Sequence, residues 1–214
     1  MDVQRSRGIA RAAELVAEGE LVVLPTDTVY GLGCDAFSPS AVAALLAAKG
    51  RGRAMPPPVL IAHVRTLDGI ATGVSDHVRA LAQAFWPGAL TIVCRSQPTL
   101  NWDLGDTGGT VAVRMPLHPV ALELLEKTGP MAVSSANLSG QPAALDCPDA
   151  ERQLGESVAV YLDSGAATLG VPSTIIDGTQ EVPRVLRLGA LSIEELRTVV
   201  PELLAEPALP EPAE

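Results

Sequence analysis

The stretch LVVLPTDTVYGLGCDAFSPSAVAALLAAKG, residues 21–50, holds a short apolar run, a polar segment and an alanine- and leucine-rich run, in that order. The apolar run LVVL ends at Pro25 and has the length of a buried strand. Ser38 and Pro39 are favoured as the cap and first residue of a helix, and Gly50 is favoured just past its end. A strand followed by a helix in this way predicts an α/β fold.

The same alternation of strands and helices continues from this stretch toward both ends of the chain. Helical spacing of apolar residues runs from Arg5 to Glu18, and a capping box at Ser192 opens a last helix. Strands 89–94 and 110–114 are close in sequence, so the sheet is predicted to mix parallel and antiparallel pairs. The other predicted elements are strands 59–62, 131–134, 158–162, 174–177 and 185–188, and helices 76–85 and 119–127.

Composition limits the class of protein. Apolar residues make up 47% of the 214 residues, which excludes a disordered chain, and the formal net charge of −10 argues against binding long nucleic acids through their phosphates. No apolar run reaches the roughly 18 residues of a membrane span. Three cysteines without CxxC spacing predict neither disulfides nor a zinc site. We therefore expect a cytoplasmic protein with one domain over residues 1–200 and an acidic, proline-rich tail over 201–214.

The segment KGRGR, residues 49–53, gathers three cations in an acidic chain. The MPPP that follows favours extended backbone, in which alternate residues share a face. Lys49, Arg51 and Arg53 would then line up and suit a polyphosphate or a carboxylate. The alternative is a solvated turn at a helix end, and charge alone does not decide between the two. Arg53 is the weakest candidate of the three.

Two glycine-containing stretches raise the question of a phosphate-binding loop. GLGCDA, residues 31–36, matches the dinucleotide pattern G-x-G-x-x-A, but TDTVY separates it from the strand, and no acidic residue lies about 20 positions on. We therefore expect these glycines, and Gly108-Gly109, to give the backbone room in turns.

Polar side chains cluster after several predicted strands, where open α/β sheets place ligands. They are Thr26 and Tyr30 in TDTVY, Ser135 and Asn137 in SSANLSG, and Ser173 before strand 174–177. Each segment alone is more often structural than functional, because such side chains also bond to their own backbone. The three histidines are isolated, with only His63 placed to touch a site, and no catalytic triad can be assembled.

Taken together, these segments resemble the YrdC-like family of threonylcarbamoyl-AMP synthases. Eight matching stretches fall in order over roughly residues 9–198, which makes the resemblance specific. The stretches are LPTDTVYGLGCDA (24–36), K-x-R (49–51), PPPVLIAHV (56–64), FWPGALTIV (85–93), VAVRMP (111–116), AVSSANLSGQPA (132–143), PSTIID (172–177) and VLRLGA (185–190). The resemblance implies a twisted mixed sheet flanked by helices, with a concave positive cavity, in the single-domain form.

The resemblance also implies a nucleotidyltransferase reaction. L-threonine, bicarbonate and ATP would give L-threonylcarbamoyladenylate and pyrophosphate, and the product would feed the modification of tRNA to N6-threonylcarbamoyladenosine by downstream transferases. The family's K-x-R and S-x-N signatures map onto Lys49, Arg51, Ser135 and Asn137. Many members place Pro directly after K-x-R, where this chain has Gly52 and then Arg53.

Roles follow for the candidate residues as expectations of this resemblance. Lys49 and Arg51 would be catalytic and neutralise the triphosphate and the carbamate. Thr26, Tyr30, Arg114 and Ser173 would bind threonine or its carbamate, while Ser135, Asn137 and Arg187 would join Lys49 and Arg51 at ATP. Mg2+ would arrive on the nucleotide, because no acidic cluster for a protein-held metal is visible.

Three other functions stay open on the sequence. The first is a module that binds double-stranded RNA or tRNA, against which the acidic balance and the scarcity of aromatic residues speak. The second is a paralogue that transfers a carbamoyl group to another acceptor. The third is an adaptor that binds nucleotide without releasing pyrophosphate.

Overall fold

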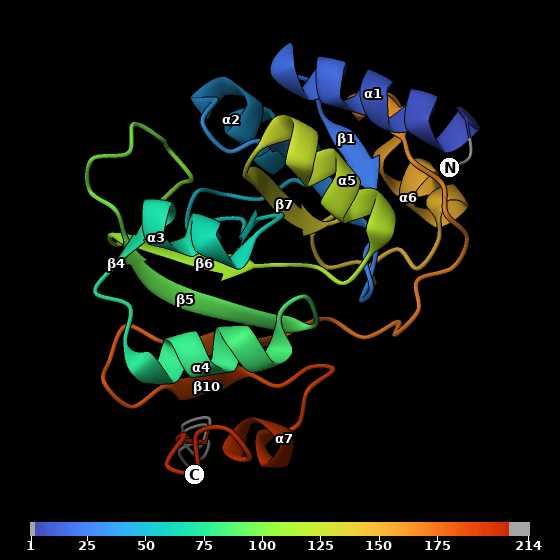
Figure 1. Ribbon diagram of the computed structural model, residues 1–214. Coiled ribbons are helices and arrows are strands. Elements are labelled where there is room, and N and C mark those ends of the chain that lie inside the picture. Colours follow the sequence, from blue (N-terminus) through green and yellow to red (C-terminus); the bar gives the residue numbers. More distant parts are fainter. Residues whose placement is uncertain (1–2, 206–214) are drawn as a thin grey trace, which may run out of the picture.

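The computed structural model describes residues 3–205, whose strands form one ten-stranded sheet (Figure 1). The strand order is β10-β9-β5-β6-β3-β7-β2-β1-β8, with β4 paired to β5 beside this path. The sheet is mixed, as predicted: β5 pairs antiparallel with β6 and parallel with β9. The strands are β1 Val22–Leu24, β2 Gly31–Asp35, β3 Val59–Leu60, β4 Ala71–Thr72, β5 Leu90–Ser96, β6 Thr110–Arg114, β7 Met131–Ser135, β8 Val160–Tyr161, β9 Thr174–Asp177 and β10 Arg184–Arg187.

Helices begin at the capping residues that the sequence indicates. Ser38 and Ser75 each accept a hydrogen bond from a backbone N–H of the first turn, at α2 and α4, and Ser192 forms a capping box with Glu195 at α7. The helices are α1 Val3–Ala17, α2 Pro39–Ala48, α3 Leu67–Ile70, α4 Asp76–Phe85, α5 Pro119–Thr128, α6 Cys147–Leu154 and α7 Ile193–Arg197, with 3-10 turns η1 Val64–Thr66 and η2 Gly155–Ser157.

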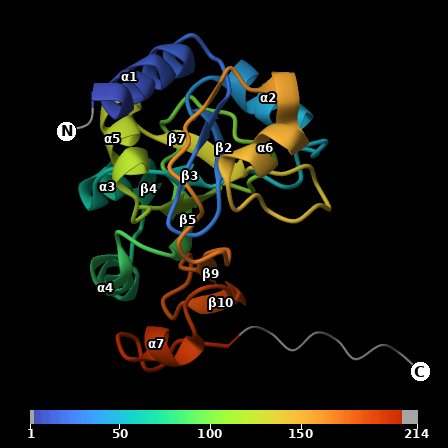
Figure 2. The same ribbon diagram turned by 90° about the vertical axis from the view of Figure 1, so that its right-hand side faces the viewer.

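Apolar side chains pack in two clusters, one on each face of the sheet. Helices α1 and α5 cover one face with residues such as Leu15 and Leu124, and Figure 2 shows α2 and α6 on the other side. The second cluster contains Leu45 of α2 and Leu154 of α6. No helix within residues 3–205 is long and apolar enough to cross a bilayer.

The sequence analysis is wrong about the glycines of GLGCDA. Gly31 and Gly33 lie in strand β2, which pairs with both β1 and β7, and not in a turn. A Cβ on Gly31 would lie 2.6 Å from Val133 Cγ1, and one on Gly33 would lie 3.0 Å from Met131 Cε. These glycines therefore let side chains from β7 lie directly across the strand. Gly108 and Gly109 do adopt positive φ before β6, as expected.

Sequence patterns miss or shift other elements. The short α3 and β4 were not predicted, because they are only four and two residues long. Helix α6 was also missed, although Asp146 caps it and its buried residues Cys147, Ala150 and Leu154 have helical spacing. The packed chain also continues past residue 200, where the sequence analysis begins the tail. Leu203 is fully buried, and Leu204 forms an isolated parallel bridge with Arg184. Residues 206–214 of the expected tail lie outside the described residues.

Replacing Gly31 with Ala should lower the free energy of unfolding by about 1–3 kcal/mol, the usual cost of overpacking a core. The added methyl would meet Val133 Cγ1 at 2.6 Å. Urea denaturation followed by circular dichroism measures the change. Gly69→Ala is the matched control, because nothing lies within 4 Å of its added Cβ. Equal stability of the two variants would contradict the proposed close contact.

Candidate active site

A cavity of about 370 Å3 opens where polar segments from several strand ends meet. Its walls come from the β1–β2 connection, the segment after α2, strands β5, β6 and β7, and the chain around Ser173. The residues that the sequence analysis proposed and that line it are Thr26, Tyr30, Arg51, Arg114, Ser135, Ser173 and Arg187. Lys49 and Asn137 do not line it, and neither do Arg53 and His63.

The cavity lining is positively charged. It contains Arg51, Arg114 and Arg187 and, among the described residues, no aspartate or glutamate. Hydroxyl groups of Thr91 and Ser134 also reach it, and three consecutive prolines, 56–58, form part of one wall. Arginines and hydroxyls without competing carboxylates suit a phosphate or carboxylate ligand.

Arg114 is held by an ion pair inside the protein. Its Nη2 donates to Asp27 Oδ1 at 2.6 Å, and the two side chains are 8% and 7% exposed. Its Nη1 donates to Thr28 Oγ1 and its Nε to the Gly88 carbonyl. The same Asp27 oxygen accepts the backbone N–H of Leu117. Burial lowers the pKa of Arg114, an effect that Asp27 opposes. Arg114 therefore fixes the shape of the site more than it offers free donors.

Arg51 reaches the cavity with donors to spare. Its Nη1 donates to Ser134 Oγ at 3.0 Å, while Nε is buried and has no partner within the described residues. Burial lowers the pKa of this guanidinium, which has no carboxylate partner among the ion pairs of residues 3–205. An anion in the cavity would supply the missing counter-charge.

Lys49 does not share a face with Arg51 and Arg53, contrary to the sequence analysis. It caps the C-terminus of α2 in a helical conformation, is 2% exposed, and precedes Gly50 at positive φ. Its Nζ donates to the carbonyl oxygens of Ser135 and, at 2.6 Å, of Asn137. Burial, followed by the charge of Arg51, lowers the Lys49 pKa to about 8. The Lys49 ammonium group therefore supports the end of β7 and the loop after it, and it does not line the cavity.

Asn137 is also occupied within this loop. Its Nδ2 donates to the carbonyls of Leu138 and Gln141, and its Oδ1 lies 3.4 Å from Lys49 Nζ. The backbone N–H of Ser139 returns to the Lys49 carbonyl at 2.9 Å. The K-x-R and S-x-N signatures are thus bonded to each other. The end of β7, just before this loop, brings Ser134 and Ser135 to the cavity wall.

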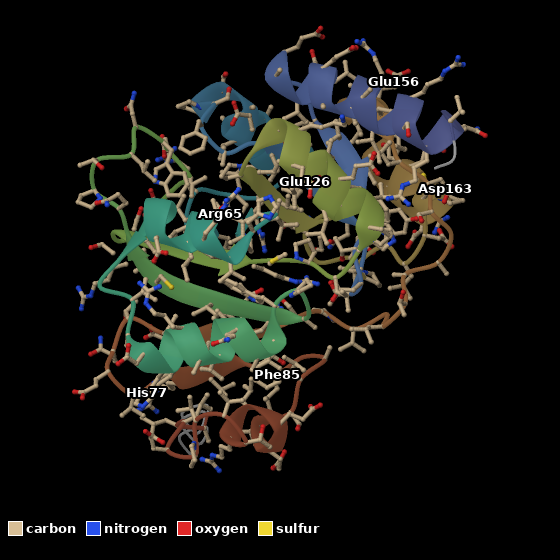
Figure 3. All side chains as sticks on the ribbon, viewed as in Figure 1. Arg65, His77, Phe85, Glu126, Glu156 and Asp163 are labelled. Carbon is tan, nitrogen blue, oxygen red and sulfur yellow. The ribbon has the colours of Figure 1, made fainter. Side chains whose placement is uncertain are left out.

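Thr26 and Tyr30 have hydroxyls that already bond to protein. Thr26 Oγ1 donates to the Val29 carbonyl at 2.6 Å, so it closes its own turn. The fully buried Tyr30 donates to the Gly165 carbonyl at 2.6 Å, next to Asp163, which is labelled in Figure 3. Burial raises the pKa of Tyr30 to about 12. Both residues shape the β1–β2 connection.

Ser173 and Arg187 are joined at another wall. Arg187 Nη2 donates to the Ser173 carbonyl at 2.6 Å, and Ser173 Oγ lies 2.8 Å from Thr91 Oγ1. Burial lowers the pKa of Arg187, and its charge in turn lowers that of Arg114. Arg187 has no carboxylate partner among the described ion pairs, so it resembles Arg51 in being free to bind an anion.

Sequence reasoning missed several residues of this site. Asp27 and Thr28 were quoted in TDTVY without a role, yet they hold Arg114. Ser134 was passed over beside Ser135, although it is the partner of Arg51. The usable signal for Asp27 was a lone acid in a buried segment, which requires a cationic partner. Thr91 offered no signal, because it lies inside an apolar strand.

The described residues offer no metal site of their own. Within residues 3–205, no group of three or more His, Cys, Asp or Glu side chains is arranged to hold an ion. Cys34, Cys94 and Cys147 are free and buried.

The chain is similar to known proteins over most of its length. The Sua5/YciO/YrdC family model, described as "Telomere recombination", matches residues 14–189. A Mycobacterium tuberculosis protein, provisionally named a threonylcarbamoyl-AMP synthase, is 56% identical over 92% of this chain and 91% of its own length. The threonylcarbamoyl-AMP synthase of Pyrococcus abyssi is 39% identical over 92% of this chain. The crystal structure of P. abyssi Sua5 complexed with L-threonine superposes with a TM-score of 0.90, at 37% identity over 96% of this chain.

The fold and cavity define an α/β protein whose cavity is lined by arginine side chains and hydroxyl groups. The chain belongs to the Sua5/YciO/YrdC family. It spans 58% of the length of the P. abyssi synthase and 61% of the chain in the P. abyssi crystal structure, against 91% of the M. tuberculosis protein.

Replacing Asp27 with Asn should lower the free energy of unfolding by about 3–5 kcal/mol, because it leaves the Arg114 charge buried without a counter-ion. Thermal and urea unfolding measure the change. Asp68→Asn is the matched control, since it breaks an ion pair with Arg79 that spans 2.8 Å, close to the 2.6 Å of the buried pair, but is about half exposed. That control should cost at most about 1 kcal/mol. Similar losses in both variants would contradict the structural role of Asp27.

Replacing Lys49 with Met should lower the free energy of unfolding by about 1–3 kcal/mol, because two buried carbonyls lose their donor. The folded-state pKa of about 8 lies below the unfolded value of 10.5, so the unfolded chain binds more protons between these pH values. Stability of the wild type should therefore rise with pH across this window relative to the variant. Urea titrations at pH 7.5 and pH 10 measure both effects. A variant as stable as wild type at both pH values would show that Lys49 does not support the loop.

Proposed function

We propose that this chain is an L-threonylcarbamoyladenylate synthase, which converts L-threonine, bicarbonate and ATP to L-threonylcarbamoyl-AMP and pyrophosphate. The observation that carries the proposal is a cavity with two arginines, Arg51 and Arg187, that have no carboxylate partner among the described residues. Homologues named threonylcarbamoyl-AMP synthase and a homologue crystallised with L-threonine support the choice of substrates.

The reaction needs no nucleophile from the protein. The threonine amine attacks carbon dioxide or bicarbonate to give a carbamate, with loss of water when bicarbonate is the reactant. A carbamate oxygen then attacks the α-phosphorus of ATP, and pyrophosphate leaves with the electrons of the broken P–O bond. Catalysis depends on holding two anions together and stabilising charge on the phosphates.

The geometry divides the candidate residues into two groups. Arg51 and Arg187 contact the phosphates and the carbamate, and the hydroxyls of Ser135 and Ser173 hydrogen-bond to the nucleotide and to the threonine end. The second group acts indirectly. Lys49 and Asn137 hold the loop that follows Ser135 at the end of β7, while Thr26, Tyr30 and Arg114 hold the walls, as their hydrogen bonds within the protein indicate.

Mg2+ is proposed to enter with ATP. The cavity lining contains no carboxylate among the described residues, so the phosphate oxygens and water would be its ligands. When bound, it would neutralise phosphate charge beside Arg51 and Arg187.

The product is an activated threonylcarbamoyl group, which tRNA threonylcarbamoyl transferases would consume in making N6-threonylcarbamoyladenosine. This would place the chain in the cytoplasm, with a catalytic domain over residues 1–200 whose packing extends to Leu203 and Leu204. Direct binding of RNA is not favoured, because the net charge is −10.

The proposal is tested by pyrophosphate release from ATP with Mg2+, bicarbonate and each amino acid in turn. Release that requires both L-threonine and bicarbonate supports it. Release with a different amino acid would revise the specificity, and carbamoyl transfer to another acceptor would favour a paralogue of different chemistry. ATP binding without release would indicate an adaptor, and salt-sensitive RNA binding without release would indicate an RNA-binding module.

Replacing Arg51 with Ala should reduce adenylate formation by at least about a hundred-fold, the usual scale for loss of a group that stabilises transition-state charge. The fold should persist, because the only hydrogen bond that the Arg51 side chain makes within residues 3–205 is to Ser134. Coupled pyrophosphate detection and circular dichroism provide the two measurements. Arg79→Met, far from the cavity lining, controls for loss of a surface arginine. Near-normal turnover of the Arg51 variant would refute its assigned role.

A further inference from the structure

The connection between β5 and β6, residues 97–109, forms a thin wall of the cavity. It runs out from the ends of the two strands toward α2 (Figure 1), where Trp102 stacks on Phe37 with ring centroids 5.4 Å apart. Leu104 and Thr107 line the main cavity, and both also line a second hollow of about 300 Å3. This second hollow is bounded almost wholly by the connection itself. Leu104 reaches the hydrophobic core, while Asp103 and Asp106 lie at the surface.

Arg53 ties this wall to the segment that carries Arg51. Its Nη1 and Nη2 donate to the two carboxylate oxygens of Asp103 at 3.0 and 2.8 Å, and its Nε lies 3.5 Å from Asp106. The hydrogen bonds from Arg53 lower the pKa of Asp103. Both carboxylates belong to the 97–109 connection, so one guanidinium binds it at two points.

Backbone contacts reinforce the same junction. The N–H of Asp106 donates to the Arg53 carbonyl at 2.9 Å, and Gly105 adopts φ +104 directly against that carbonyl. A Cβ at Gly105 would lie 2.7 Å from the Arg53 oxygen. A single exposed ion pair contributes little, but a bidentate pair within a small network of charges fixes a relative position.

We propose that Arg53 is a positioning residue that holds the 97–109 connection against the Arg51 segment and so closes one wall of the nucleotide site. Arg53 does not touch the substrate, because its charge is already satisfied by Asp103 and Asp106 outside the cavity lining. The positioning role rests on the proposed synthase function, whereas the attachment of the connection by Arg53 does not depend on it.

The consequence for the reaction lies in binding. Leu104 and Thr107 face the same space as Arg51 and the prolines that follow it. Without the Arg53 side chain, only the backbone contacts and the buried Leu104 hold the two walls together, so their relative position is less fixed and the nucleotide must order them on binding. Loss of Arg53 should therefore raise the KM for ATP about two- to five-fold and leave kcat within about two-fold.

The experiment compares wild type with Arg53→Met, Asp103→Asn and the double variant. Asparagine keeps an oxygen for the N–H of Gly105, which bonds to Asp103 Oδ1. Arg79→Met is the matched control, because its pair with Asp68 also spans 2.8 Å and is similarly exposed, and it lies outside the lining. Two readouts are taken: steady-state constants for pyrophosphate release, and acrylamide quenching of tryptophan fluorescence. The chain has two tryptophans, of which Trp86 is buried, so quenching reports on Trp102 in the connection.

Acrylamide quenching and the KM for ATP should both rise in each single variant. In the double variant, neither quantity should exceed its value in Arg53→Met. Quenching that stays at the wild-type value in Arg53→Met would overturn the attachment. Increased quenching with unchanged KM would overturn the positioning role. A higher KM in Arg53→Met together with a lower KM in Asp103→Asn would show direct contact between Arg53 and ATP, which also contradicts the proposal. If the wild type releases no pyrophosphate, the synthase function and the positioning role fail together, and the quenching arm still decides whether Arg53 holds the connection.

Discussion

The buried ion pair between Asp27 and Arg114 is the interaction on which the cavity depends. Two charges removed from water are stable only when each is paired and its remaining hydrogen-bonding groups are satisfied. Asp27 also accepts the N–H of Leu117, and Arg114 also donates to Thr28 and Gly88. This one pair thus joins the β1–β2 connection, the end of β6 and the chain before β5. The walls of the cavity are therefore fixed relative to one another without a ligand.

Much of what looks like a ligand-binding motif serves to hold loops in place. Lys49 donates to the Asn137 carbonyl, and the Asn137 side chain donates to the Gln141 carbonyl in the same loop. The Tyr30 hydroxyl donates to the Gly165 carbonyl. The groups left free at the cavity are few, chiefly Arg51 and Arg187. This arrangement suits a reaction in which orientation of two anions matters more than a protein nucleophile, because a rigid loop presents its free donors in a fixed direction.

The sequence predicts elements with strong local signals and fails where distant contacts decide. Caps at Ser38, Ser75 and Ser192 are local, so they are found. Gly31 was misplaced in a turn, because its reason for being glycine is Val133, about a hundred residues away. The sequence analysis placed Lys49 beside Arg51 by assuming an extended chain. Instead, Lys49 caps α2 in a helical conformation, and Gly50 at positive φ turns the chain before Arg51. Seven of the proposed site residues do reach the cavity.

The distribution of charge has a consequence for how substrates arrive. The chain carries a formal net charge of −10, yet its cavity presents arginines without a carboxylate among its described lining residues. Beyond a Debye length of about 10 Å, solvent ions screen both fields, and just inside it the acidic surface repels a nucleotide anion. Attraction begins only at the cavity mouth. This charge distribution favours short-range capture of a compact anion over binding of a long polyanion.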